Sequence, residues 1–217
     1  MSIPILFEDA EALVIDKPAG LPVAPPRRGG PSLDDHLDEL RLNFMRRPVP
    51  VHRLDADTSG CLLLARNPKA LKRFQRAFEN RLVDKRYLGV LAGEPPDAEG
   101  TIDLPLLKVS SEEAGWRMIV DADGKASVTR WRLLAVHGGN SLVEFHPVTG
   151  RTHQIRIHAA EALGHGLVGD PVYGANPRND THTMLHASQI KVEREGKPPV
   201  MAEAPFPQVF RDLGFEP

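Results

Sequence analysis

Between residues 101 and 146 the chain is dominated by β-type runs separated by turn signals, and this arrangement limits the fold more than any other feature. Apolar, β-branched runs bounded by Gly, Asn and Asp are typical of strands joined by hairpins. Asp123-Gly124 and Gly138-Gly139-Asn140 are such hairpin signals. Because these strands follow one another without intervening helices, we expect a largely antiparallel sheet. The predicted strands are Thr101–Val109, Trp116–Asp121, Ala126–Val136 and Leu142–His146.

Segments on either side of this region add further strands and the helices. The remaining strands are expected within Ile5–Asp16, Gly60–Ala65 and Val83–Leu91, and near Leu185–Val192 before a proline-rich tail. Three helices are predicted: one capped by Ser32 with Leu33, Leu37, Leu40 and Phe44 on one face, one starting at Asn67-Pro68, and one over His153–Leu163 capped by Thr152. The fold class is α+β, with a largely antiparallel mixed sheet and flanking helices and loops. No linker is visible, so residues 1–217 are expected to form a single domain.

Composition narrows the functional classes. A net charge of −2 does not favour a globally basic nucleic-acid binder, although RNA binding needs only a local patch. The single cysteine, Cys61, precedes Leu62-Leu63-Leu64, which indicates a buried thiol and excludes a disulfide framework within the chain. We find no signal peptide and no run near the roughly 18 apolar residues of a membrane span, so a cytoplasmic protein is expected. No nucleotide-binding glycine loop is present, and no cofactor is expected.

A local basic patch lies between Lys69 and Arg86, a segment that contains seven cationic residues and two acidic ones. On the predicted helix, Leu71, Phe74, Ala77 and Phe78 form one apolar face, and Lys72, Arg73 and Arg76 lie mostly off it. These three cations are candidate contacts for RNA phosphates. An ordinary solvated helix face remains the alternative explanation.

Two polar segments are candidates for chemistry. Residues 51–60, Val-His-Arg-Leu-Asp-Ala-Asp-Thr-Ser-Gly, offer a carboxylate nucleophile with cationic and hydroxyl neighbours, but composition alone favours a simple Asp-rich turn. In residues 147–158, Gly150 allows a tight turn and the following helix start favours an anion. Arg151 and Arg156 lie there, with ordinary surface cations as the alternative. A third segment, Gly169–Gly174, is a turn with an aromatic residue and is weak by itself.

In order and spacing, these segments resemble the motifs of the RluA type of ribosomal and transfer RNA pseudouridine synthases. His52-Arg53-Leu54-Asp55 followed by Thr58-Ser59-Gly60 resembles the signature loop of that family. The other matching motifs are Lys17–Val23, Lys85-Arg86-Tyr87, Thr149–Arg156, Gly169–Gly174 and Leu185-His186-Ala187. The resemblance runs from about residue 5 to residue 207. Because the early loop is reached by residue 17, we expect a short form of the family without an N-terminal S4 RNA-binding domain.

The resemblance implies a reaction and a set of site residues. Asp55 would be the nucleophile that isomerises uridine to pseudouridine, and Arg156 would pair with Asp55 and keep it ionised. Tyr87 would stack on the uracil, with a strand tyrosine packed in the core as the alternative. Leu185 would line the apolar floor of the pocket. The further residues expected at the substrate are His52, Arg53, Arg151, Lys72, Arg73 and Arg76.

The implied substrate is structured ribosomal and/or transfer RNA, bound by a monomer that needs no metal. A uridine in folded RNA must be flipped out of the stack before it can react. Arg53 would fill the vacated space, with a salt bridge to Asp55 or Asp57 as the alternative role. Arg151 would contact a phosphate, and it is the alternative to Arg156 as the partner of Asp55.

Two other functions stay open. His153 and His158 suggest a metal-dependent hydrolase, but a spacing of five places their rings about 140° apart on a helix and on opposite sides of a strand. The zinc pattern needs i, i+4 with an intervening glutamate. The second alternative is a non-catalytic RNA-binding module that has kept the fold.

Overall fold

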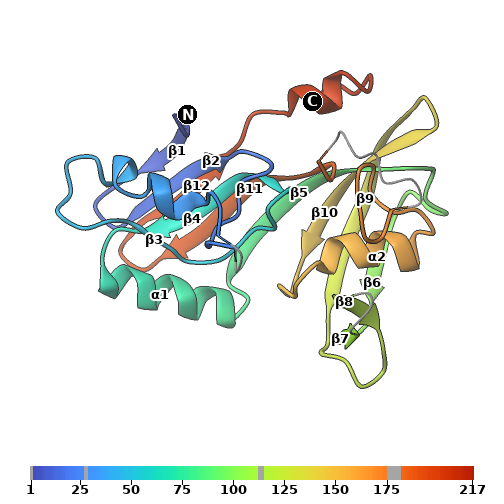
Figure 1. The fold of residues 1–217 in the computed structure, drawn as a ribbon, viewed down its shortest axis with the longest axis horizontal. Coiled ribbons are helices and arrows are strands. Elements are labelled where there is room, and N and C mark those ends of the chain that lie inside the picture. Colours follow the sequence, from blue (N-terminus) through green and yellow to red (C-terminus); the bar gives the residue numbers. More distant parts are fainter. Residues whose placement is uncertain (1, 27–28, 112–114, 175–181) are drawn as a thin grey trace. The chain divides into compact units, whose positions relative to one another are not determined.

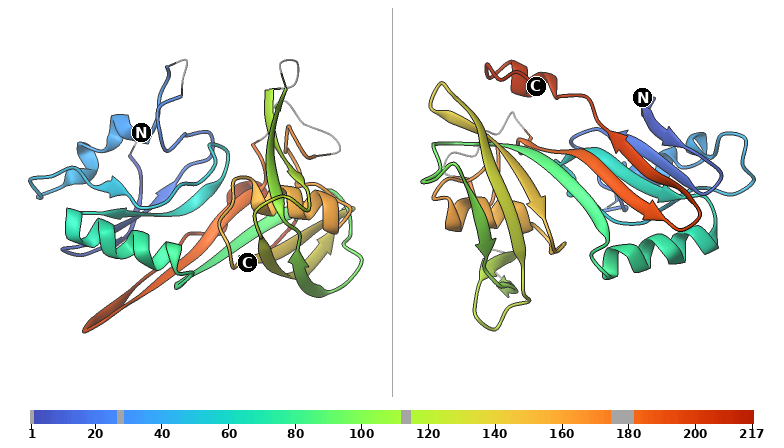
Figure 2. Two further views of the ribbon diagram at one scale, coloured as in Figure 1. Left: turned by 90° about the horizontal axis from the view of Figure 1, so that it is seen from below. Right: turned by 180° about the vertical axis from the view of Figure 1, so that it is seen from behind.

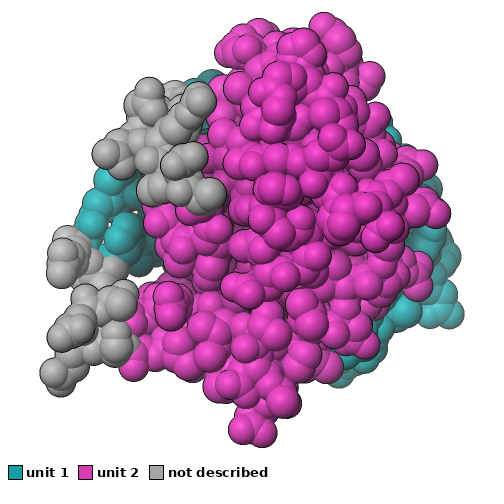
Figure 3. Space-filling model, turned by 90° about the vertical axis from the view of Figure 1, so that its right-hand side faces the viewer, with its two compact units in different colours: residues 1–85, 186–205 teal, residues 86–185, 206–217 magenta. Residues whose placement is uncertain are grey.

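The structure is a computed structural model that describes residues 2–26, 29–111, 115–174 and 182–217. The chain forms two compact units (Figure 3): unit 1 comprises residues 1–85 and 186–205, and unit 2 comprises residues 86–185 and 206–217. The chain passes from one unit to the other three times: inside strand β5 (Val83–Leu91), after the first residue of strand β11 (Leu185–Arg194), and between Pro205 and Phe206. Strand crossings of this kind explain why no linker is visible in the sequence.

Unit 1 is built on strands in the order β1-β2-β4-β11 (Figure 1), with β12 paired to β11 and β3 paired to β4. All of these pairs are antiparallel except β4 with β11, which is parallel and joins Ser59 to His186 and Gly60 to Ala187. β2 and β4 carry the core because nearly all of their side chains are buried. The bounds are β1 Ile5–Glu8, β2 Ala12–Lys17, β3 Val49–Pro50, β4 Ser59–Ala65 and β12 Lys197–Glu203.

Helix α1 (Pro68–Glu79) packs against β4 in unit 1 and begins where the sequence predicts. The Asn67 side chain caps it by accepting a hydrogen bond from the Ala70 N–H at 2.9 Å. Phe74 and Ala70 are buried on the inner face, while Lys72 and Arg76 are exposed.

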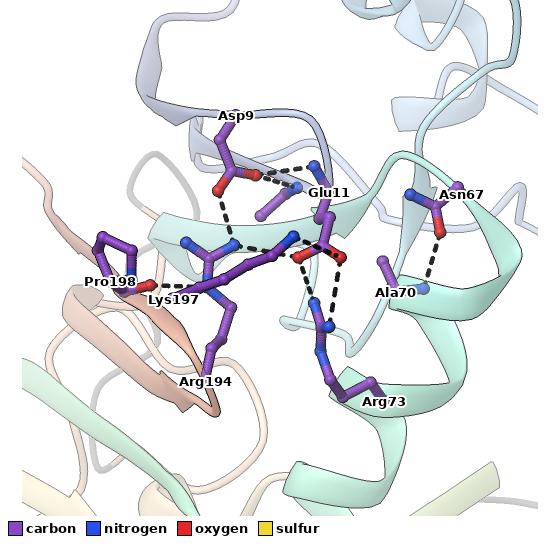
Figure 4. A network of polar contacts seen from close by, with 9 residues as sticks. Asp9, Glu11, Asn67, Ala70, Arg73, Arg194, Lys197 and Pro198 are labelled. Atoms are coloured by element: carbon purple, nitrogen blue, oxygen red, sulfur yellow. Dashed lines mark hydrogen bonds and ion pairs between the residues drawn. The ribbon is translucent and has the colours of Figure 1, made fainter.

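The third helix cation, Arg73, belongs to a polar network that ties α1 to the turn between β1 and β2 (Figure 4). Its guanidinium donates to both carboxylate oxygens of Glu11, at 3.3 and 2.5 Å. From the β11–β12 hairpin, Lys197 lies 3.2 Å from Glu11, and Arg194 bonds to Asp9 at 2.6 Å. The pKa of Glu11 is lowered chiefly by its hydrogen bond with Arg73, so the carboxylate stays ionised.

Unit 2 is built on the strand order β5-β10-β9-β6, all antiparallel, with a separate two-stranded ribbon of β7 and β8. Helix α2 (Gln154–Ala162) lies against β9 and β10 (Figures 1 and 2), where Ile155 and Ala159 pack into a core with Phe145 and Trp131. The short helix α3 (Gln208–Arg211) contributes Phe210 to a second core. The strand bounds are β6 Glu99–Asp103, β7 Leu106–Ser111, β8 Gly115–Val120, β9 Val128–His137 and β10 Asn140–Pro147.

The predicted fold class is confirmed, and most predicted elements are present. β5 coincides with the prediction, and Gly138-Gly139 forms the hairpin between β9 and β10 with positive φ at both glycines, 58° and 79°. Within the described residues, no helix is long and apolar enough to cross a membrane.

Two predicted elements are wrong because local backbone geometry overrides the apolar pattern. The predicted helix from Leu33 is reduced to two 3₁₀ turns, Leu33–His36 and Glu39–Arg41, and Leu42, with φ 52°, ends the second turn. Leu33, Leu37 and Leu40 are nevertheless buried. The spacing of the apolar residues therefore predicted correctly which side chains are buried, but not the helix. The predicted strand Thr101–Val109 is two strands, because Pro105 between β6 and β7 has no N–H to donate.

Two further expectations need correction. The strand near Leu185–Val192, which was expected to be the last one before a proline-rich tail, is followed by a further strand: Lys197–Glu203 forms β12 on one side of β11, with Pro198 and Pro199 at its start. Thr152 does not cap α2, because the cap position is His153, which adopts the left-handed conformation and makes no side-chain capping bond. In addition, the Asp123-Gly124 turn does not join the two strands of a hairpin. It leads from β8, which pairs with β7, to β9, which pairs with β10 and β6.

We predict that Gly60→Ala destabilises unit 1 strongly. Gly60 has φ 101°, and a Cβ there would lie 2.3 Å from the Ala187 carbonyl oxygen. The strained backbone and the clash should together lower the free energy of unfolding by about 2–5 kcal/mol, measured by urea denaturation. Gly196→Ala is the matched control, because Gly196 also has positive φ (67°) but open space around it, and should cost only about 1–2 kcal/mol. Equal losses in the two variants would contradict the close approach of β4 and β11.

Candidate active site

The loop between β3 and β4 carries Asp55 and is anchored by apolar side chains. Val51, Leu54 and Thr58 are buried, Arg53 is exposed, and Asp55 is half-buried. The Thr58 N–H donates to the Asp55 carbonyl oxygen at 3.2 Å, which closes the turn. The apolar side chains of the loop therefore point inward, and the Arg53 side chain between them faces solvent. Arg53 forms no salt bridge with any residue that the structure describes, so its alternative role as a partner of Asp55 or Asp57 is not realised.

A buried lysine supports this loop from the motif at residues 17–23. The Lys17 ammonium is fully buried and donates to the carbonyl oxygens of Pro18, Leu21 and Ala56, at 2.7, 2.8 and 2.9 Å. Burial lowers the pKa of Lys17 to about 8, while the charges of Asp57 and Asp55 oppose that shift. At neutral pH the group is therefore mostly protonated, and it places a positive charge beside both loop carboxylates.

His52 supports the loop from its other end. Its Nε2 accepts a hydrogen bond from the Leu63 N–H in β4 at 3.1 Å, and its ring stacks on Phe78 of α1 at 4.6 Å. Burial, with the nearby charge of Lys85, lowers the pKa of His52 to about 3, so the ring is neutral and can act as the acceptor. These contacts give His52 a role in holding the loop. Its predicted contact with substrate stays a prediction.

The end of the loop is fixed where β4 meets β11. The Ser59 hydroxyl lies 2.8 Å from His186 Nδ1, and the backbones of Gly60 and Ala187 are in close contact. His186 is buried, and burial lowers its pKa to about 4, so the bond joins a hydroxyl and a neutral imidazole. Three contacts from distant parts of unit 1 thus hold the loop that carries Asp55.

In unit 2, Arg156 forms a bidentate pair with Asp170. Arg156 Nε and Nη2 donate to the two carboxylate oxygens at 2.7 and 2.8 Å, and both side chains are buried. Burial alone would raise the pKa of Asp170, but the Arg156 bonds and charge outweigh it and lower the pKa. Asp170 also accepts from the N–H groups of Val172 and Tyr173, which fixes the turn that begins there. The predicted pairing of Arg156 with Asp55 stays a prediction.

Gln154 organises the start of α2 in place of the predicted Thr152 cap. Its side-chain oxygen accepts from the Thr149 hydroxyl at 2.7 Å and from the Arg151 N–H at 3.0 Å. Its amide nitrogen donates to the Val128 carbonyl and the Thr129 hydroxyl. Arg151 is half-buried, and its Nε donates to the Ala126 carbonyl at 3.3 Å. The helix start is therefore tied to β9 before Arg156 is reached.

Tyr87 and Leu185 adjoin the same apolar cluster in unit 2. Leu185 is buried in it with Phe145 and Ile155, and the half-buried Tyr87 packs against it. Gly89 leaves room for this packing, because a Cβ there would lie 3.5 Å from Leu185 and 3.0 Å from Phe145. The two residues thus share one apolar environment, which also fits the alternative of a strand tyrosine packed in the core, and their contacts with uracil stay predictions.

The remaining candidates differ in their surroundings. Lys72 and Arg76 face solvent, whereas Arg73 is held by Glu11. His153 and His158, which suggested a metal site, have other contacts: His153 Nδ1 lies 3.0 Å from the Tyr173 hydroxyl, and His158 bonds to Thr129 and to the Leu104 carbonyl. In the described part of the chain, no group of three or more His, Cys, Asp or Glu residues is placed to hold a metal ion.

Sequence reasoning missed several residues that shape these sites. Lys17, Asp170, Tyr173 and His186 all lie inside segments that resemble family motifs, but without assigned roles. Their signal was the unusual presence of a charged or polar residue in an otherwise apolar or turn-forming segment.

The chain is similar to known proteins in both sequence and structure. Residues 11–161 match the family described as RNA pseudouridylate synthase. An RNA pseudouridine synthase of Zymomonas mobilis, itself uncharacterized, is 54% identical over 97% of both chains, and one of Synechocystis is 35% identical over 97% of this chain and 68% of the relative. The solved structure of human RNA pseudouridylate synthase domain containing 1 superposes with a TM-score of 0.78 at 30% identity, covering 95% of this chain and 84% of that one.

The matched region contains the Asp55 loop, and the similarity extends over nearly the whole chain. The chain belongs to the RNA pseudouridylate synthase family, whose members are isomerases.

Proposed function

We propose that this protein isomerises uridine to pseudouridine in structured ribosomal or transfer RNA, with Asp55 as the nucleophile. The observation that carries the proposal is the support of Asp55. Its loop, in a chain of this family, rests on the buried ammonium of Lys17. A nucleophilic carboxylate must be ionised, and a nearby cation favours the ionised form. Lys17 supplies such a cation within unit 1.

The chemistry suits a carboxylate held in this way. The bond between uracil N1 and ribose C1′ breaks, the base turns, and a new bond forms from C5 to C1′, with the C5 proton moving to N1. Asp55 would attack C1′ or the base, or assist a glycal route, and all three routes need its negative charge at the reacting nucleotide. Tyr87 would stack on the uracil and Leu185 would form the floor beneath it. Arg156 would act with Asp55 at the same nucleotide.

The target uridine has to leave the RNA stack, and we propose that Arg53 assists this step. It is exposed, it precedes Asp55 by two residues, and no described residue holds it in a salt bridge. A guanidinium can stack on neighbouring bases and donate to phosphates at the same time. We therefore assign Arg53 to the space that the flipped base vacates.

The name of one relative supports ribosomal RNA as a substrate. The ribosomal large subunit pseudouridine synthase D of Zymomonas mobilis is 34% identical over 85% of this chain and 60% of that protein. Exposed Lys72 and Arg76 on α1, with Arg151 in unit 2, would contact phosphates of the folded RNA. We further propose that the protein acts as a cytoplasmic monomer.

The proposal is tested by mapping pseudouridine across total RNA from cells with and without the gene. We expect one or a few uridines, in large-subunit ribosomal RNA or transfer RNA, to lose the modification when the gene is deleted. An unchanged map would contradict the proposed activity.

Replacing Asp55 should abolish catalysis. Asp55→Asn keeps the shape but removes the charge and the nucleophile, so turnover should be lost while RNA affinity stays within about tenfold. Asp57→Asn is the matched control in the same loop and should slow turnover by less than about tenfold. The measurement is tritium release from C5-labelled uridine in RNA. Multiple turnover by Asp55→Asn would remove Asp55 from its assigned role.

The cations of α1 should separate into two groups. Lys72→Glu with Arg76→Glu should weaken binding to all RNAs alike and flatten the salt dependence by roughly 0.7 to 0.9 units of log–log slope for each phosphate that is no longer neutralised. Arg73→Glu should instead lower stability, because it places a like charge against Glu11. Filter binding at several salt concentrations and urea denaturation distinguish these outcomes. If the salt dependence of binding is unchanged in the double variant, this helix face faces solvent and does not contact RNA.

Arg53→Ala should act on chemistry more than on affinity. Because Arg53 is assigned to the flipped nucleotide, its removal should slow the chemical step under single-turnover conditions and change the salt slope by the equivalent of about one phosphate at most. A variant with normal single-turnover rate and weaker binding would assign Arg53 to the RNA backbone instead. Pre-steady-state assays at saturating enzyme provide the measurement.

A further inference from the structure

A continuous series of cationic and aromatic side chains runs through unit 2 from the ribbon β7–β8 to Arg156. The Lys108 ammonium lies 4.7 Å from the centre of the Trp116 ring, whose centre is 5.0 Å from that of His153. The His153 ring meets Tyr173 edge-on at 5.6 Å, and the Arg156 guanidinium lies 5.3 Å from the Tyr173 ring centre. All of these separations fall in the range of favourable aromatic and cation–π contacts.

The ribbon is fixed to the body of unit 2 at its base. Strand register pairs Lys108 with Met118 and Ser110 with Trp116, so Lys108, Trp116 and Met118 share one face. Met118 is buried with Leu106 and Ile157, and its N–H donates to the Tyr173 hydroxyl at 3.0 Å. The inner part of this face therefore packs on α2, and the outer part presents Trp116.

Trp116 is the exposed tryptophan of the chain. It is 46% exposed, whereas the other tryptophan, Trp131, is 6% exposed. A half-exposed indole leaves apolar surface in contact with water, which a stacked ligand would cover. Its neighbour Lys108 is exposed and has a long side chain, so its ammonium can leave the ring for a phosphate when a planar group stacks there. An aromatic platform beside an adaptable cation matches the two parts of a nucleotide.

We propose that Trp116 is a stacking platform for an unpaired base of the bound RNA, and that Lys108 contacts an adjoining phosphate. The inference rests on the proposed function and deepens it by naming a contact for RNA outside the target uridine. Single-stranded RNA is commonly bound by bases stacked on aromatic side chains beside cations. The series from Trp116 ends at Arg156, so a base on Trp116 would be linked through His153 and Tyr173 to a residue assigned to catalysis.

Tryptophan fluorescence tests the contact directly. In a Trp131→Phe variant the only remaining indole is Trp116, and we expect large-subunit ribosomal RNA or oligouridylate to protect it from quenching by acrylamide. The wild-type protein gives the same measurement if that variant fails to fold, because buried Trp131 adds a background that the quencher reaches poorly. Unchanged quenching at RNA concentrations that saturate the protein by filter binding would overturn the inference.

Measurements of RNA affinity provide a second test of the Trp116 contact. Trp116→Ala should weaken RNA binding roughly 5- to 100-fold, the range expected when one stacked base is no longer supported, and Trp116→Phe should restore most of it. Leu134→Ala is the control, because Leu134 is similarly exposed, at 41%, on β9 of the same unit. Circular dichroism verifies that each variant is folded. Equal affinity of Trp116→Ala and wild type would overturn the inference.

The outcomes separate this inference from the proposed function. Isomerisation of RNA without protection of Trp116 would contradict only the stacking platform. Protection of Trp116 without any uridine isomerised would contradict only the proposed activity.

Discussion

The loop that carries Asp55 depends on the ammonium group of Lys17. A lysine without solvent contact is costly unless every N–H donor finds an acceptor, and here three backbone carbonyls accept. Two of these carbonyls belong to the segment that follows Lys17, and the third belongs to Ala56, between the two loop aspartates. One charged group thus joins two loops that lie far apart in the sequence. The same positive charge lies close enough to Asp57 and Asp55 for their negative charges to act on it.

Unit 2 uses a buried cation in a similar way, with a different kind of partner. Arg156 is compensated by the full charge of Asp170, and removing either partner of such a pair typically costs about 3–5 kcal/mol because a buried charge is left behind. Asp170 also holds the N–H groups of the following turn, which places Tyr173 against His153. In both units, therefore, the candidate functional side chains are positioned by buried charges whose partners come from other loops.

This dependence on distant partners explains which features the sequence could predict. Strand β5 and helix α1 were predictable because their patterns are local: a strand-length run ending in buried Gly89, Val90 and Leu91 in one, and the Asn67 cap with Phe74 on the inner face in the other. The Asp55 loop was found through its motif. The support from Lys17 was not, because Lys17 and Ala56 are 39 residues apart and nothing in either segment indicates that the two are in contact. The start of α2 was misplaced for the same reason, since side-chain bonds from Gln154 to β9 decide it.

The near-neutral net charge is consistent with RNA binding once the placement of charges is considered. Several carboxylates, including Glu11, Glu144 and Asp170, are engaged with arginines inside each unit and cancel locally. Beyond roughly 8 Å in physiological salt, exposed charges are largely screened, so acidic residues elsewhere on the surface do little to offset Lys72 and Arg76. In the proposed function, the field that RNA would meet is therefore set by the cations that face solvent on α1 and on the ribbon β7–β8. The net charge of the whole sequence does not reveal these surfaces, because it counts paired and solvent-facing charges alike.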